Sequence, residues 1–175
     1  MPTSLATVYK GWGDYQISLV RAVAPRSPEQ LTWRPAPHLR TAGEIASHMI
    51  NGRLDWFTRT FGAEFPALAG LVAAWKAEEA IEGKPEKLAS WFEASWQIVD
   101  EALNRWTVDD LARTWPLTYQ GRNYALPYQW ILWRVMTHDI HHGGELAFTF
   151  GLQNIALPDL GDDFGHITPP PLAEP

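Results

Sequence analysis

The chain contains no cysteine. That absence excludes disulfide bonds, zinc sites built on thiolates and catalysis by a cysteine nucleophile. Long apolar runs are lacking too, because no stretch approaches the ~18 uninterrupted apolar residues that span a bilayer. Residues 1–10 also lack the basic and then apolar pattern of a signal peptide. We therefore expect a cytoplasmic protein with no membrane partner.

Positive charge is scarce as well. Fourteen Lys and Arg face twenty Asp and Glu, which gives a net charge of −6 with no basic block. Nucleic-acid binding depends mostly on cationic contacts to phosphate, so we expect no nucleic-acid partner. What the 175 residues do hold is 46% hydrophobic residues and 10 Trp. This length and composition favour a single domain over residues 1–175 with an aromatic-rich core.

Four long segments carry apolar residues at helical spacing. The first covers residues 4–24, and the second begins at the capping box Thr41–Glu44 and fades near residue 61. The third starts at Pro85, and the fourth runs from Pro127 to about Phe150. These segments predict an all-α fold, a four-helix bundle over residues 4–151. One long crossover holds a short helix over residues 71–81, a small hairpin covers 113–126, and residues 152–175 form an irregular tail.

Two of the six histidines share one face of the fourth helix. His138 and His142 are four residues apart, which places them about 40° from one another around the helix axis. Imidazoles one turn apart can share one metal ion. His142 continues the apolar stripe of this helix, whereas His141 lies on a more polar face. We therefore choose His138 and His142 as metal ligands and leave His141 either at the rim or among the residues that support the ligands.

A third ligand has to come from another helix. His48 is the candidate, because it lies about two turns into the second helix, on or beside its apolar stripe. His38 in a loop and His166 in the tail are less constrained. Three imidazoles leave coordination positions open for water or substrate, and they suit Zn or Ni first, then Fe or Mn. The competing interpretation is that these histidines are ordinary core or surface residues.

The motif His138-x-x-His141-His142-x-Gly144-Glu145-Leu146, with His48 upstream, resembles the DinB-like family of DNA-damage-inducible metal-binding bundles. The stretch Leu31-Thr32-Trp33-Arg34-Pro35 extends the likeness. The resemblance implies an up-down-down-up four-helix bundle, a homodimer, and a divalent ion on His48, His138 and His142. Related members are bacillithiol- or mycothiol-dependent S-transferases and maleylpyruvate isomerases. The commonest family motif reads His-His-Arg-Gly-Gln, so Gly143 and Glu145 change the charge expected at the pocket edge.

Three functions follow as hypotheses. The first is a metal-dependent thiol S-transferase or hydrolase, in which the ion activates a low-molecular-weight thiol or water against a small-molecule substrate. Glu145 then accepts a proton, or it orients a ligand. The second is a metal-holding protein that binds a ligand without turnover. The third is a structural site in a dimeric scaffold, with Glu145 or His141 as a fourth ligand.

Other charged side chains carry weaker signals. We expect Asp139 to be a solvated charge on the helix surface. Arg40, Arg53 and Arg59 either recognise an anionic substrate or form surface ion pairs, and the second interpretation is favoured.

Overall fold

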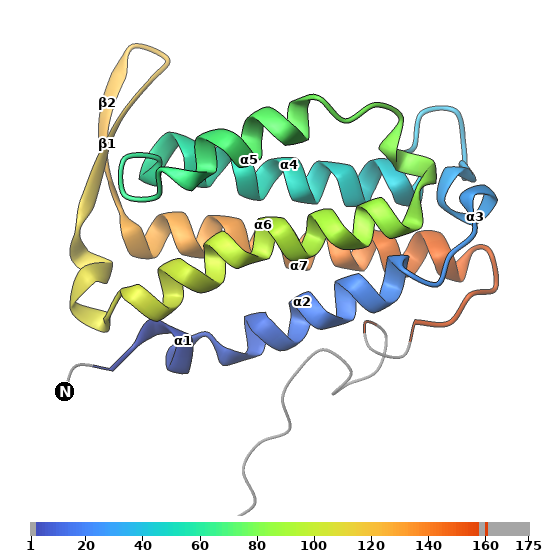
Figure 1. Ribbon diagram of the computed structural model, residues 1–175, viewed down its shortest axis with the longest axis horizontal. Helices are drawn as coiled ribbons and strands as arrows, with labels where there is room; N and C mark the ends of the chain where they lie inside the picture. The colour runs from blue at the N-terminus through green and yellow to red at the C-terminus, as the bar shows by residue number, and fades with distance from the viewer. Residues whose placement is uncertain (1–2, 158–159, 161–175) are drawn as a thin grey trace, which may run out of the picture.

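The computed structural model describes residues 3–157 and residue 160, and this part of the chain is mostly helical with one small antiparallel hairpin (Figure 1). That composition confirms a predominantly helical fold with a small hairpin. Most of the predicted tail lies outside the described residues, as does His166. The elements in chain order are α1 (Leu5–Val8), α2 (Lys10–Val23), α3 (Pro28–Thr32), α4 (Ala42–Phe61), α5 (Ala67–Lys76), η1 (Ile81–Gly83), α6 (Pro85–Arg105), η2 (Val108–Ala112), β1 (Thr114–Tyr119), β2 (Arg122–Pro127) and α7 (Tyr128–Gly151).

Local sequence signals set most helix boundaries. Thr41 and Glu44 form the predicted capping box, with each side chain accepting a hydrogen bond from the other residue's backbone N–H. Pro85 opens α6 at a position where its missing N–H costs nothing. The predicted first helix is wrong in one respect, because Tyr9 leaves helical geometry (φ −105°, ψ 25°) and divides it into α1 and α2.

The short helix of the crossover also differs from the prediction. It spans Ala67–Lys76 rather than residues 71–81. Pro66 precedes its first turn, and Ala80 adopts a left-handed conformation (φ 47°) just before Ile81, so a continuous helix cannot reach that residue.

The four long helices lie against one another in a ring: α2 contacts α6, α6 contacts α4, α4 contacts α7, and α7 contacts α2. In Figure 1, α2 and α7 run from left to right, and α4 and α6 run from right to left. The core between them contains Leu19, Met49, Phe92 and Leu146. At one end Trp106 packs against Phe61 and Tyr128, with ring centroids 4.7–5.0 Å apart among the three.

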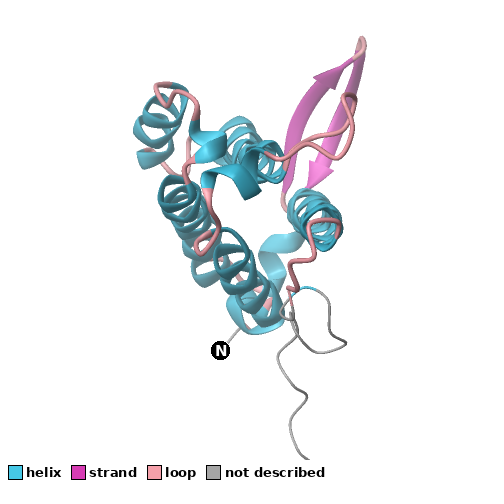
Figure 2. Ribbon diagram, turned by 90° about the vertical axis from the view of Figure 1, so that its right-hand side faces the viewer, coloured by secondary structure: helices cyan, strands magenta, loops and turns pink. Residues whose placement is uncertain are grey.

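The β1–β2 hairpin pairs Thr114 with Pro127 and Tyr119 with Arg122. Its two-residue turn, Gln120–Gly121, has positive φ at both positions, which matches the right-handed twist of paired strands. The hairpin projects beyond the helices (Figure 2). Across the described residues, the helices are too short or too polar to cross a bilayer.

Candidate functional site

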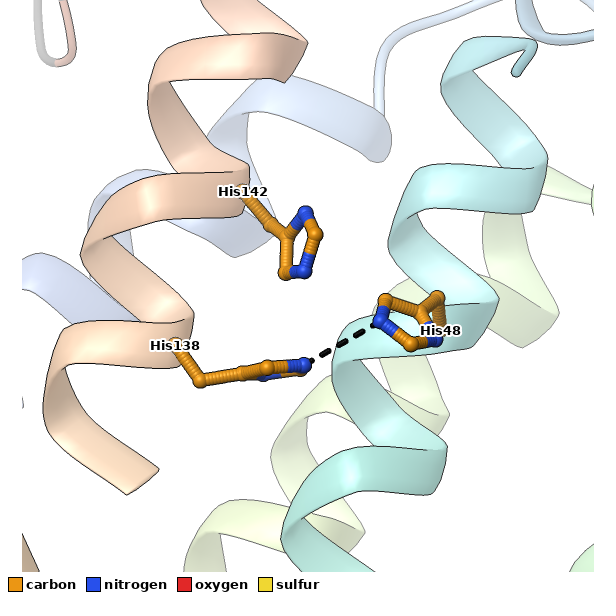
Figure 3. Close-up of side chains that lie close together, drawn as sticks. All are labelled: His48, His138 and His142. Atoms are coloured by element: carbon orange, nitrogen blue, oxygen red, sulfur yellow. Dashed lines mark hydrogen bonds between the residues drawn. The ribbon is translucent and has the colours of Figure 1, made fainter. Parts of the chain in front are cut away.

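Helices α4 and α7 bring three histidine rings together. His48 comes from α4, and His138 and His142 come from α7, and the rings converge in the space between the two helices (Figure 3). The ring centroids lie 4.4–4.9 Å apart, and the Nε2 atoms of His48 and His138 are separated by 3.2 Å. The structure therefore places the three sequence-predicted ligands in one cluster.

The donor set fits a divalent ion. At ~2.1 Å from each nitrogen, tetrahedral coordination places neighbouring nitrogens about 3.4 Å apart. One ring nitrogen from each histidine lies within 4.8 Å of the other two, and the His48–His138 separation is already close to the coordinated value. Without an ion, one of these two Nε2 atoms has to carry a proton and donate it to the other. Nδ1 of His138 is buried and has no hydrogen-bond partner among the described residues.

Glu145 holds His142 in a defined orientation. Its Oε2 lies 2.6 Å from Nδ1 of His142, one turn away on the same helix. A carboxylate on Nδ1 fixes the proton there and leaves the lone pair of Nε2 available to a metal ion. Figure 3 shows one nitrogen of His142 pointing towards the other two rings and one pointing away. This arrangement is the usual support for a metal-bound imidazole.

His141 lies at the rim, one of the two places that the sequence left open for it. Its side chain is exposed, and its Nε2 lies 3.6 Å from Oε1 of Glu145. With His142 and Glu145 it forms a second group of nearby donor atoms. Burial by itself raises the pKa of Glu145, but the hydrogen bond from His142 and the nearby charges of His141 and Arg40 hold that pKa below its ordinary value. Glu145 is therefore a carboxylate at neutral pH.

The surroundings of His138 and His48 favour the neutral form of these two rings. Burial, followed by repulsion from His142 and His48, lowers the pKa of His138 to about 4. Burial and the charge of Arg40 also lower the pKa of His48. Imidazoles that are neutral at pH 7 offer the lone pairs that a metal ion requires.

Gly52 supports the cluster, although its role was not recognised from the sequence. A Cβ atom at this position lies 2.6 Å from Cε1 of His138, so the imidazole fits against α4 only because glycine has no side chain. The available signal is that Gly52 lies one turn after His48 on the same helix.

Asp139 and Arg53 correct the sequence analysis, which expected a solvated charge and a surface ion pair. They form an ion pair with 0% and 1% side-chain exposure, in which Nε of Arg53 lies 3.0 Å from Oδ2 of Asp139. Trp12 donates from Nε1 to the same oxygen at 2.9 Å. Asp139 lies about 100° around α7 from His138, so it faces the core between the helices, where Arg53 and Trp12 meet it, while His138 faces the cluster. Arg59 does form the predicted surface ion pair, with Asp55.

Gly143 requires a second correction. It is buried against α2, and a Cβ atom there overlaps the hydroxyl of Tyr15. That hydroxyl lies 3.3 Å from the backbone oxygens of Asp139 and Ile140, where it can donate to either. The position is therefore at a helix contact and not at the pocket edge, so an arginine here has no room.

A cavity of about 550 Å³ lies beside the cluster. The loop before α4, the first turn of α4 and the C-terminal half of α7 form its walls. His38, which the sequence analysis set aside as a ligand, contributes to the lining, as do His141 and Glu145. The volume falls within the range of small-molecule sites. Its lining residues are Pro35, His38, Leu39, Arg40, Ile45, His141, Gly144, Glu145, Phe148 and Thr149.

Comparison with known proteins finds a matching family model and a similar crystal structure. The model of the DinB superfamily matches residues 16–146, a span that includes the three clustered histidines and Glu145. The crystal structure of a DinB-like protein from Bacillus cereus is similar, with a TM-score of 0.64 and 20% sequence identity over 90% of this chain and 98% of that chain. At that identity the likeness concerns the fold alone. None of the curated proteins matches the chain.

Proposed function

This chain belongs to the DinB superfamily, and from that premise and the geometry of the cluster we propose that it binds one divalent metal ion through His48, His138 and His142. We further propose that it uses the ion on a small molecule held in the adjacent cavity. The observation that carries the proposal is the convergence of three imidazoles from two helices. Zn and Ni are the first metals to test, and Fe and Mn are the next.

We interpret α2, α4, α6 and α7 as a four-helix bundle in the up-down-down-up order. The ring of helix contacts and the opposed directions of the two pairs support this interpretation. Bundles of this kind build metal sites from side chains on facing helices, as α4 and α7 do here. The homodimer implied by the sequence resemblance stays a prediction, which sedimentation of the purified protein tests.

The proposed chemistry is thiol transfer or hydrolysis. A divalent ion held by three imidazoles supplies a Lewis acid that lowers the pKa of a bound thiol or water towards neutrality. The protein's own residues do the rest: Glu145 holds His142 in its tautomer, Gly52 admits the ring of His138, and the cavity walls position the electrophile. The reaction class is therefore attack of the activated thiol or water on an electrophilic carbon, with release of a leaving group.

Glu145 has two roles in this proposal. Its Oε2 orients His142, which makes it a positioning residue. Its Oε1 lies 3.6 Å from Nε2 of His141, and Glu145 lines the cavity, so this oxygen is the proposed proton acceptor. Because Glu145 bonds to the nitrogen of His142 that points away from the cluster, the geometry supports an open coordination position over closure by this carboxylate.

Metal content tests the site directly. Plasma mass spectrometry of the purified, untagged protein should find about one divalent ion per chain, and His48→Ala should lose it. His38→Ala is the matched control, because His38 lies in the neighbouring loop and is not in the cluster. If His48→Ala keeps the ion, His48 is not a ligand. If the wild-type protein takes up none of Zn, Ni, Fe and Mn, the metal proposal is wrong.

Turnover separates an enzyme from a binding protein. The metal-loaded protein is mixed with 2-mercaptoethanol and 1-chloro-2,4-dinitrobenzene, which form an aryl thioether, chloride and a proton. A parallel reaction with 4-nitrophenyl acetate reports hydrolysis. We expect at least one rate to exceed that of the metal-free protein and of His48→Ala. A metal-loaded protein that accelerates neither reaction favours the second candidate, ligand binding without turnover. The hydrogen bond between Glu145 and His142 supports this candidate, because a carboxylate that already accepts from His142 is less available as a base.

A further inference from the structure

The cavity beside the histidine cluster combines an apolar wall with the guanidinium of Arg40. Leu39 and Phe148 line it while remaining 42% and 66% exposed. Large apolar side chains this exposed, gathered in one concave site, are typical of a surface that packs against an apolar ligand. Arg40 and His38 lie on the same lining.

Arg40 differs from most other arginines of the described chain in how its guanidinium is used. Arg34 donates to the Leu39 carbonyl and to Glu44, Arg59 is paired with Asp55, and Arg53 is buried on Asp139. Arg40 has neither a hydrogen bond nor an ion pair within the part of the chain that the structure describes, and its side chain is exposed on the cavity lining. A guanidinium binds a carboxylate through two parallel hydrogen bonds, so this is a ready partner for one.

The carboxylates nearby are already engaged. Glu44 is bonded to Arg34 and to the backbone of Thr41, and Glu145 is bonded to His142. Neither forms an ion pair with Arg40. Helix α4 begins two residues after Arg40, and its N-terminal turn carries Glu44. The charge of Arg40 also acts on His48 and Glu145, which places it within electrostatic reach of the cluster.

We propose that Arg40 binds the carboxylate of a small substrate whose apolar body packs on Leu39 and Phe148. The substrate class is therefore an amphiphilic organic acid, with its reacting end directed towards the histidine cluster. This inference rests on the proposed function, because the bound acid is a substrate only if the histidine cluster is catalytic. The cavity lining itself contains none of the three clustered histidines.

Calorimetric titration of the metal-free protein tests the site without any contribution from an ion. The probes are 4-phenylbutyrate and 4-phenylbutanamide, which share shape and differ in charge. A charge-assisted bidentate contact should make the acid bind about tenfold or more tightly than the amide. Arg40→Gln should remove that preference. Phe148→Ala should weaken both probes and keep the preference.

The control is Arg59→Gln, which removes an exposed arginine at the other end of α4, one that is paired with Asp55 and lies outside the cavity. It should leave both affinities unchanged. Equal affinities of the acid and amide, a preference that survives Arg40→Gln, or failure of both probes to bind at millimolar concentration would each overturn the proposal. Because these titrations use metal-free protein, their failure leaves the metal proposal standing. Conversely, loss of the metal proposal leaves their result intact.

Discussion

Two polar clusters join α4 to α7, and they differ in how fully the protein uses their polar atoms in hydrogen bonds. In the buried cluster, Arg53 of α4 meets Asp139 of α7, and both carboxylate oxygens accept hydrogen bonds from Arg53 or Trp12. Nη1 of Arg53 donates to Gln16 at 2.6 Å. Only Nη2 lacks a partner there among the described residues, and the guanidinium lies 5.6 Å from the ring centroids of Phe92 and Trp96.

The histidine cluster sits one residue away on α7, yet its nitrogens remain available. Two imidazole nitrogens face one another at 3.2 Å, and Nδ1 of His138 is buried without a partner in the described residues. The nitrogen of His142 that faces the other two rings forms no hydrogen bond within the described residues, because Glu145 engages only Nδ1, so this cluster keeps a nitrogen available to a ligand. We therefore propose different tasks for the two clusters: the Arg53–Asp139 cluster holds the helices together, and the histidine cluster binds a ligand.

The largest change in stability is expected when the buried Arg53–Asp139 cluster is broken. Arg53→Met should lower the free energy of unfolding by about 3–5 kcal/mol, because it leaves the Asp139 carboxylate buried without its cation. Urea denaturation measures the loss. Arg53→Met with Asp139→Leu should recover most of it, since an apolar pair of similar volume replaces both charges.

Arg59→Met is the matched control for that measurement. It removes a surface ion pair, which contributes less than about 1 kcal/mol. If Arg53→Met destabilises the protein no more than Arg59→Met, then the buried ion pair does not hold α4 against α7.

The next prediction concerns the contact of α7 with α2. Gly143→Ala should cost about 1–3 kcal/mol of unfolding free energy, because the new methyl group displaces the Tyr15 hydroxyl from its site on α7. In a Tyr15→Phe background the same change should cost less, since the overlapping oxygen is gone. Thermal or urea unfolding of the four proteins gives the coupling energy. Fully additive effects would contradict the proposed overlap.

The fold and the cluster were largely predictable, and the buried ion pair was not. Helical spacing placed His138 and His142 on one face, and the Thr41–Glu44 box fixed where the helix of His48 begins. Both signals are local, because they depend on residues within one or two turns. The surroundings of Asp139 are not local: Trp12 is 127 residues away and Arg53 is 86 residues away in the chain. A helical wheel shows which residues share a face, but not which partner that face meets.

The same limit explains Gly143 and Gly52. At the sequence level each is a small residue in a helix, which only lowers helix stability. Their purpose appears when the neighbouring helix is in place, because one admits the Tyr15 hydroxyl and the other admits the His138 ring.

Changes at Glu145 test whether its hydrogen bond to His142 positions that ring for metal binding. Glu145→Leu should weaken metal binding about 10- to 100-fold, because Nδ1 of His142 loses the acceptor that orients the ring. Glu145→Gln should lose less, since its amide oxygen still accepts from Nδ1–H. Competition with a chromophoric chelator measures both affinities. Equal affinities of the Gln and Leu variants would show that the hydrogen bond has no part in positioning the ring.

The smallest change in stability should come from Gly52→Ala, and it separates the two tasks most cleanly. Alanine favours a helix interior by up to about 1 kcal/mol over glycine, so the metal-free protein should be as stable as the wild type or slightly more stable. The new Cβ lies 2.6 Å from Cε1 of His138, however, and the ring has to move away from its place beside His48. Metal affinity should therefore fall by about tenfold or more, because a ligand ring must be held within about half an ångström of its productive position.

Gly70→Ala in α5 is the control for Gly52→Ala, since its Cβ meets nothing within 4 Å. It should show the same small gain in helix stability with unchanged metal affinity. A Gly52→Ala protein that keeps its metal affinity would mean that the His138 ring binds from a different position. A Gly52→Ala protein that loses several kcal/mol of stability would mean that the histidine cluster also holds the helices together. The expected outcome, lost metal at unchanged stability, requires that α4 and α7 are held by the Arg53–Asp139 cluster while the histidines are left for the ligand.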